Sequence, residues 1–298
     1  MSDSALTEEA RLQIGRIEQS ISKSHELVSA GLVTTEESAR SAVARFTKTN
    51  VDALVACCLM WSEDQPILGV LEEMRDTPLL LWCWTPGTSL PDSLTALDLI
   101  RWSGPVGAQQ ISGALRRSGK KFMFVMGNHD ENETIREIQE FLAAAAVARS
   151  LRHARIGLLP YRYDVMTNTW VDEFYLRSKI GVDVIYISVD ELALSAASVK
   201  DAEVKSYVDD LQGISVSPQV SSKGLSQAAR TSLGVAKIVK DRRLDALSIG
   251  DCNDELHAVL KCRPCLYLPS VFERGVVVGS ESDLLGILAQ LILARLSG

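Results

Sequence analysis

The sequence predicts an α/β protein of two tandem three-layer domains, each with a parallel sheet of the Rossmann or flavodoxin-like type. Short apolar runs alternate with helical patterns along most of the chain, and parallel strands need long, usually helical, crossovers. The alternation restarts after an alanine-rich helical segment (FLAAAAVARSLRH). This restart predicts domains of 1–153 and 154–298, and a length of 298 residues suits two domains.

In the first half, two opening helices precede an alternation of strands and helices. The second opening helix has Thr34, Thr35 and Glu37 in capping positions. The predicted helices are 7–24, 34–47, 65–75, 104–118 and 131–151, and the predicted strands are Val51–Leu59, Pro78–Trp82 and Lys121–Met126.

The second half repeats the alternation and contains one long polar segment, Gly213–Gly224. This segment is rich in Ser with Pro and Gly, so it is a surface connection or an active-site loop. The predicted strands are Arg155–Leu159, Val182–Ser188, Ala246–Ile249, Cys265–Leu268 and Val276–Val278, and the predicted helical regions are 168–179, 190–212, 225–240 and 282–296.

Composition and charge exclude several classes of protein. Apolar residues make up 46% and charged residues 23% of the chain, which is typical of a globular protein. A net charge of -7 argues against nucleic-acid binding, which needs a basic stripe. No uncharged apolar run is long enough to span a membrane, and the acidic, polar start is unlike a secretory signal. We therefore expect a cytoplasmic protein with reduced core thiols, such as the adjacent Cys57 and Cys58.

Two segments near the end of the chain each run from an apolar strand through an acidic turn to a helix. These are Leu244–Leu260, which contains Glu255, and Gly275–Gly298, which contains Glu281 and Asp283. In a parallel sheet these acids lie at the carboxyl edge, where open α/β sheets bind ligands, and two converging carboxylates indicate a metal and a substrate. The simpler alternative is helix capping and compensation of the helix dipole.

Other patterns indicate chemistry less strongly. Cys252, His257, Cys262 and Cys265 have a spacing that could bind zinc, but they would fall on a turn, a helix and a strand of a layered domain. GNHD at 127–130 and GDCND at 250–254 resemble pieces of the metallophosphoesterase signature in reversed order, without an Asp-x-His or His-x-His. Four tryptophans near strand ends form either core or a sugar-stacking wall: Trp61, Trp82, Trp84 and Trp102.

Taken together, the segments resemble the L-fucose isomerase and L-arabinose isomerase superfamily. VDALVACCLMW, TPLLLWCW and SGPVGAQQISGALRRSGKKFMFVMG are similar in order and spacing to that family's N-terminal domain. ARIGLLPYRYDVMTNTWVDEFYLRSKIGVDVIYISVDEL is similar to the start of its second domain. ESDLLGILAQLILARLSG resembles the family's Glu-x-Asp-x-x-Gly helix start.

The resemblance implies an aldose–ketose isomerase that acts on a monosaccharide through an ene-diol intermediate with a divalent metal, usually Mn²⁺. It implies catalytic roles for Glu255 and Asp283, and a metal held by Glu255, Asp283 and Glu281. In such a site the metal holds both sugar oxygens and offsets the developing negative charge, while carboxylates move a proton between C1 and C2.

The chain departs from the family pattern at its end, where relatives continue into a β-rich third domain that supplies a metal-binding histidine. We therefore expect an isomerase that is incomplete without a third domain or partner subunit. The resemblance implies a homo-oligomer, trimer or hexamer, or a hetero-oligomer with a separate C-terminal domain, and an apolar final helix is consistent with such packing. The alternative is a non-catalytic sugar-binding or structural subunit that retains the fold.

Overall fold

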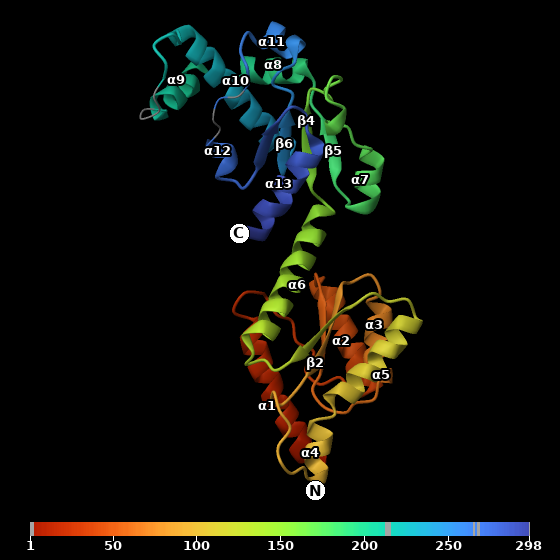
Figure 1. The fold of residues 1–298 in the computed structure, drawn as a ribbon. Helices are drawn as coiled ribbons and strands as arrows, with labels where there is room; N and C mark the ends of the chain where they lie inside the picture. The colour runs from red at the N-terminus through yellow and green to blue at the C-terminus, as the bar shows by residue number, and fades with distance from the viewer. Residues whose placement is uncertain (1–2, 212–215, 265, 267–268, 298) are drawn as a thin grey trace. The chain divides into compact units, whose positions relative to one another are not determined.

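The computed structural model describes residues 3–211, 216–264, 266 and 269–297 and confirms the α/β class (Figure 1). The chain forms two compact units. The first ends at Ala146, and the second begins at Val147. Each unit contains a parallel sheet, of three strands in the first and four in the second. The division between the units lies within helix α6 (Asn132–Leu151), and the domain boundary near residue 153 stays a prediction.

The first unit is a three-stranded sheet of order β1-β2-β3 with helices on both faces. Helix α4 was not predicted from the sequence, and its start is capped by Thr95. The elements that precede α6 are α1 (Asp3–Ile21), α2 (Glu36–Thr49), β1 (Leu54–Cys58), α3 (Gln65–Glu73), β2 (Leu79–Trp84), α4 (Ala96–Arg101), α5 (Gly104–Arg117) and β3 (Met123–Gly127).

Strand β2 shows why the first unit is layered, since all six of its residues are buried. Leu79, Leu81 and Cys83 pack against α3 and α5, whereas the alternate residues Leu80, Trp82 and Trp84 pack against α1 and α6. Successive side chains of a strand point to opposite faces, so a central strand covered on both sides must be apolar throughout.

The second unit is a four-stranded sheet of order β5-β4-β6-β7, and all of its strands are parallel. Its elements are β4 (Arg155–Leu159), the 3₁₀ turn η1 (Thr167–Thr169), α7 (Glu173–Lys179), β5 (Asp183–Tyr186), α8 (Val189–Ala197), α9 (Asp201–Asp210), α10 (Ser222–Asp241), β6 (Ala246–Ile249), α11 (Asp254–Leu260), α12 (Pro269–Phe272), β7 (Val277–Ser280) and α13 (Leu284–Ser297).

Three predicted elements of this unit differ from the structure or lie outside it. The helix predicted at 168–179 begins at Glu173, because Asp172 caps it by accepting a hydrogen bond from the Tyr175 amide. The helical region predicted at 190–212 consists of α8 and α9, which are separated at 198–200. Of the strand predicted at Cys265–Leu268, only Leu266 is described, and it lies in a bend.

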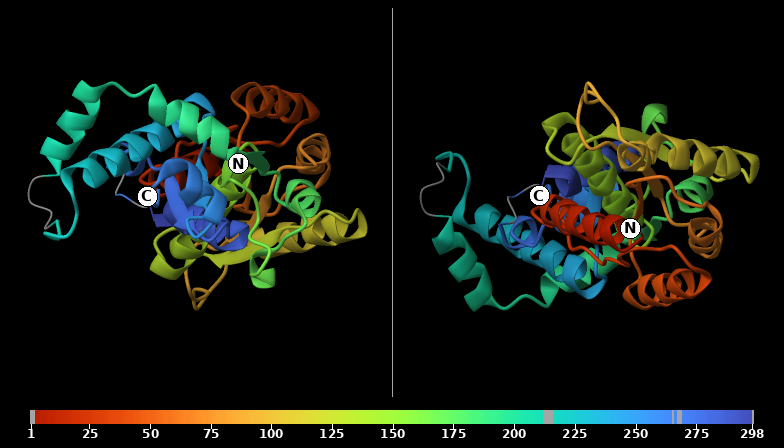
Figure 2. Two further views of the ribbon diagram at one scale, coloured as in Figure 1. Left: turned by 90° about the horizontal axis from the view of Figure 1, so that it is seen from above. Right: turned by 90° about the horizontal axis from the view of Figure 1, so that it is seen from below.

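Helices cover both faces of the second sheet. Buried residues of α8, α10, α11 and α12 pack on one face, and residues of α7, α13 and the end of α6 pack on the other. Helix α9 packs against α10 rather than the sheet, as Figures 1 and 2 show. In α13 one side is buried, whereas Leu285, Leu293 and Leu296 are exposed. Among the described residues we find no helix with the length and apolarity that a membrane crossing requires.

Candidate functional site

The path of the chain through the second sheet indicates where a ligand would bind. The chain runs from β4 to its neighbour β5, returns past β4 to β6 on the other side, and then continues outward to β7. The crossover helices change face at this reversal, since α7 packs on one face and α8 and α10 pack on the other. Ligands of open α/β sheets bind outside the carboxyl ends of the strands at such a switch point. The loops that follow β4 and β6 form its two walls.

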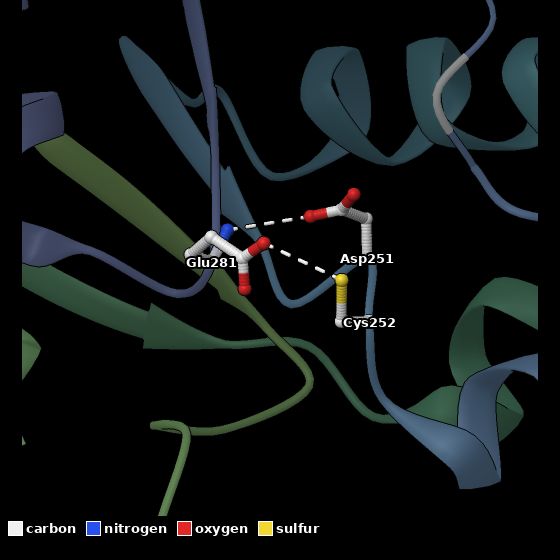
Figure 3. Close-up of side chains that lie close together, drawn as sticks. All are labelled: Asp251, Cys252 and Glu281. Carbon is white, nitrogen blue, oxygen red and sulfur yellow. Dashed lines mark hydrogen bonds between the residues drawn. The ribbon is translucent and has the colours of Figure 1, made fainter. Parts of the chain in front are cut away.

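Three potential metal ligands meet at the carboxyl ends of β6 and β7. Asp251 and Cys252 follow β6, and Glu281 follows β7; their ligand atoms all lie within 4.8 Å of one another. The Cys252 thiol donates to Glu281 Oε1 at 3.4 Å, and the Glu281 amide donates to Asp251 Oδ1 at 3.4 Å, as Figure 3 shows. All three residues are partly buried. Two ligands on one ion, each bonded at roughly 2.0 to 2.6 Å, lie at most about 5 Å apart, so the spacing suits a shared metal.

The backbone brings these two turns unusually close together. A Cβ atom at Gly250 would lie 2.6 Å from Ser282 Oγ and 3.3 Å from the Leu159 carbonyl oxygen, so only glycine fits there without a shift. Glu281 and Ser282 have φ values of 61° and 55°, a left-handed conformation that is uncommon for residues other than glycine. Strained backbone of this kind concentrates at functional sites.

A buried hydroxyl lies directly beside the cluster. Ser282 is 1% exposed, and its Oγ has no hydrogen-bond partner among the described residues. Buried polar atoms are nearly always paired, so an orphaned one next to converging carboxylates fits a site that gains a ligand. The residues present therefore fit a metal ion in two respects: they offer suitable ligand atoms, and the unpaired Ser282 hydroxyl lies next to them.

Carboxylates predominate among the candidate ligands of the cluster. The hydrogen bond from Cys252 to the Glu281 carboxylate, together with burial and the negative charges of Asp251 and Glu281, raises the pKa of the thiol. Carboxylate oxygens such as those of Asp251 and Glu281 suit Mg²⁺, Ca²⁺ or Mn²⁺, whereas a thiolate would favour zinc.

The structure brings one of the three predicted site residues into this cluster. Glu281 is a member of the cluster, and its role as a metal ligand stays a prediction. Asp283 Oδ1 accepts the Gly286 amide at 2.9 Å just before α13 begins, so the capping interpretation of this residue is confirmed. Glu255 lies in the first turn of α11, is exposed, and accepts a hydrogen bond from Tyr161 at 3.1 Å. The metal-binding and catalytic roles of Glu255 and Asp283 stay predictions.

Sequence reasoning missed Asp251 and Cys252 as partners of Glu281. The signal was present, because both residues directly follow an apolar strand and the glycine at 250, within the segment GDCND. The four-residue zinc interpretation gains no support: Cys262 Sγ lies 3.3 Å from Thr231 Oγ1, a His257 ring nitrogen contacts the Asp251 carbonyl oxygen, and Cys265 is outside the described residues.

A second feature of the same edge is a pocket of about 610 Å³ beyond β4 and β5. Its walls come from the loop after β4, the start of α7 and the last residue of β5. The lining residues are Tyr161, Arg162, Asp164, Val171, Asp172, Glu173, Phe174 and Tyr186. The pocket thus combines aromatic rings, carboxylates and one guanidinium group, which are the groups that bind the apolar faces and hydroxyls of small polar ligands.

Two tyrosines connect the pocket with the loop that carries the metal-ligand candidates. The Tyr161 hydroxyl donates to Glu255 Oε2 at 3.1 Å and accepts from Asn253 Nδ2 at 3.0 Å. The Tyr163 hydroxyl donates to the Cys252 carbonyl oxygen at 3.5 Å. Asn253 also caps α11 through its side chain. The loops after β4 and β6 are therefore held together across the switch point.

Comparison with known proteins gives a distant similarity. No protein-family model matches the chain. Over 267 residues, or 90% of its length, the chain is 21% identical to the sulfoquinovose isomerases of Priestia aryabhattai and of Priestia megaterium strain ATCC 12872 / QMB1551. The chain spans 58% of the length of these curated relatives. Both relatives are sugar isomerases by name.

Proposed function

We propose that the chain is the sugar- and metal-binding part of an aldose–ketose isomerase. The observation that carries the proposal is the convergence of the Asp251 and Glu281 side chains at the carboxyl edge of the second sheet, beside its switch point. The similarity to sulfoquinovose isomerases over 90% of the chain supports the same activity. The resemblance to L-fucose and L-arabinose isomerases is a finer version of this proposal.

In this proposal, the carboxylates of Asp251 and Glu281 hold a divalent cation, Mn²⁺ by the resemblance. When bound, the ion polarises the two sugar oxygens that exchange between the aldose and the ketose. The Cys252 thiol orients the Glu281 carboxylate by donating a hydrogen bond to it. Water and the sugar supply the remaining ligands, because Mn²⁺ takes more donors than the two carboxylates offer.

Glu255 is the proposed proton carrier between C1 and C2 of the sugar. Glu255 lies in the first turn of α11, which follows β6, and its Oε2 accepts a hydrogen bond from the Tyr161 hydroxyl. A proton carrier must lie within hydrogen-bond reach of the carbon-bound proton it moves, and Tyr161 fixes the direction of this side chain. Tyr161 is therefore a positioning residue in the proposal.

Oligomerisation and a third domain belong to the proposal as well. The exposed leucines of α13 are an apolar surface of the kind that contacts another domain or subunit. We propose that the isomerase is completed by such a contact, in a homo-oligomer or with a separate C-terminal domain.

Metal binding to the full chain tests the proposal without requiring turnover. Isothermal titration with Mn²⁺ is expected to give one site, which Asp251→Asn and Glu281→Gln each weaken by roughly ten-fold or more, because each variant removes a charged oxygen ligand. Asp283→Asn is the matched control: it keeps a capping side chain and is expected to leave the affinity within about three-fold. Equal losses in all three variants would instead support Asp283 as a ligand.

Turnover is followed by NMR of aldose to ketose conversion in D₂O, where a carboxylate that takes the proton from C2 and exchanges with solvent introduces deuterium at C1 of the ketose. Glu255→Gln is expected to retain Mn²⁺ binding and to reduce conversion by roughly 10²-fold or more. Conversion at the wild-type rate in this variant would contradict the proposed role of Glu255. Metal and sugar binding without conversion would support the alternative of a non-catalytic subunit.

A further inference from the structure

The pocket beyond β4 and β5 contains a guanidinium group, that of Arg162, which forms no ion pair with the described residues. Arg162 lines the pocket, and its Cζ atom lies 4.5 Å from the centroid of the Trp170 ring. The Trp170 indole is itself fixed, because its Nε1 donates to the Tyr163 carbonyl oxygen at 2.9 Å. Stacking on a fixed indole holds the plane of the guanidinium while its N–H donors stay available at the edge.

Neighbouring arginines of the same unit differ from Arg162. Arg177 pairs with Asp183 and Arg242 pairs with Glu191, whereas no carboxylate of the described residues lies within ion-pair distance of Arg162. Arg162 is exposed, and a guanidinium without an ion-pair partner has its donors available for bidentate binding of an oxyanion.

Two of the carboxylates that line the pocket already accept hydrogen bonds from the protein. Asp172 caps α7 through the Tyr175 amide, and Glu173 Oε1 accepts the Tyr186 hydroxyl. The pocket is nevertheless acidic overall, since Asp164, Asp172 and Glu173 outnumber Arg162. A bare anion would be repelled by this lining. A ligand with hydroxyl groups for the carboxylates and one anionic group for the guanidinium satisfies both.

We propose that this pocket binds a monosaccharide that carries an anionic substituent, and that Arg162 binds this substituent. The inference rests on the proposed function and assigns its substrate class. The shared chemistry is a carboxylate, phosphate or sulfonate on a sugar. The relatives are sulfoquinovose isomerases, a name consistent with a sulfonated sugar.

Tyr161 connects the proposed binding site of the anionic substituent with the proposed proton carrier. It lines the pocket with Arg162 and also donates to Glu255, the proposed proton carrier. In this proposal the anionic substituent binds at Arg162 and the reacting carbons lie toward Glu255. In this arrangement Arg162 determines specificity and is distant from the metal-ligand candidates in sequence and by strand position.

Calorimetric titration of the full chain tests the assignment in four arms: glucose, glucuronate, glucose 6-phosphate and sulfoquinovose. Inorganic phosphate and sulfate are titrated separately. We expect at least one anionic sugar to bind more tightly than glucose and more tightly than either inorganic ion. The arm with the tightest binding identifies the substituent as carboxylate, phosphate or sulfonate. If glucose binds as tightly as every anionic sugar, or if no sugar binds, the assignment is wrong.

Variants of Arg162 separate recognition by its guanidinium from general electrostatics. Arg162→Gln is expected to weaken the preferred anionic sugar by roughly ten-fold or more and to leave glucose binding unchanged, because only the charge-assisted hydrogen bonds are lost. Arg162→Lys is expected to recover part of this loss, since it restores the charge without the planar fork. Arg117→Gln, an exposed arginine of α5 in the first unit, makes the same charge change and is expected to have no effect.

Failure of this inference can be told apart from failure of the proposed function. An undiminished preference for the anionic sugar in Arg162→Gln overturns the pocket assignment while Mn²⁺ binding and isomerisation remain intact. Conversely, the anion preference is expected to persist in Glu281→Gln, in which Mn²⁺ affinity and turnover are lost. Loss of the anion preference in Glu281→Gln, with Arg162→Gln unaffected, would place the anionic group at the metal cluster instead.

Discussion

The carboxyl edges of the two sheets are built from similar strands but are used differently. In the first unit this edge is filled: the Trp84 indole donates to His129 Nδ1 at 3.1 Å, the two rings stack, and both side chains are buried. In the second unit the same edge carries the partly buried Asp251, Cys252 and Glu281 and the neighbouring pocket. One edge is an extension of the core, and the other is accessible to ligands.

The difference follows from topology. In the first sheet the strands run β1-β2-β3 in one direction, and α3 and α5 of the two crossovers pack on the same face. The loops after these strands therefore do not diverge. In the second sheet the chain reverses direction around β4, and ligands of open α/β sheets bind at such a switch point. Only the second unit has a strand order that changes direction, and the candidate site lies in this unit.

The largest expected effect concerns the aromatic residues of the first unit. Trp82 is fully buried in β2, and Trp82→Ala is expected to lower the unfolding free energy by about 3 to 5 kcal/mol through the cavity it leaves. Trp61 is 53% exposed, and Trp61→Ala is expected to change the unfolding free energy by no more than about 0.5 kcal/mol. Hydrogen exchange of first-unit peptides in urea measures both. A similar small effect for both would contradict the core assignment of the tryptophans.

A smaller effect is expected where α5 closes the edge of the first sheet. A Cβ at Gly104 would lie 2.6 Å from the Trp84 carbonyl oxygen and 2.8 Å from that of Cys58, so Gly104→Ala is expected to cost about 1 to 3 kcal/mol. Gly113 lies in the same helix with no atom within 4 Å of an added Cβ, and Gly113→Ala is expected to stabilise α5 by up to about 1 kcal/mol. Thermal unfolding of the two variants gives the comparison, which fails if both shift the midpoint in the same direction.

The smallest expected effect is a change in thiol reactivity that distinguishes the two edges. The hydrogen bond to Glu281 raises the pKa of Cys252, so Glu281→Gln lowers that pKa and increases the thiolate fraction at pH 8. Each unit of decrease raises the alkylation rate by roughly ten-fold below the pKa. Burial raises the pKa of Cys58 in the first unit to about 12, so we expect its thiol to stay protonated and unreactive both in the unmodified chain and in Glu281→Gln.

Site-resolved mass spectrometry after iodoacetamide treatment measures these rates. Glu255→Gln is the control, since Glu255 bonds to Tyr161 rather than to Cys252. An unchanged Cys252 rate in Glu281→Gln, or an equal increase in Glu255→Gln, would contradict the contact between Cys252 and Glu281.

Part of the site was predictable from local sequence. Glu281 follows an apolar strand and precedes a helix, and this order alone indicates the carboxyl edge of a parallel sheet. The partnership of Glu281 with Asp251 was not predictable, because it depends on β6 and β7 being neighbours and on the close approach of Gly250 to Ser282. Asp283 illustrates the opposite case. Its position allowed either a helix cap or a metal ligand, and the hydrogen bond it accepts from the Gly286 amide joins residues that are close in the sequence, so it does not depend on strand pairing.

The amino-acid sequence by itself determined the class of fold, since the alternation of apolar runs and helical periods fixes which segments become strands and which become crossovers. It also determined that acidic side chains would end strands of the second half. Only the tertiary structure decided the strand order β5-β4-β6-β7, the switch point beside β4, and the meeting of residues from separate loops. The physical reason is that secondary structure depends on neighbours along the chain, whereas a site depends on which strands pair and how closely their backbones approach.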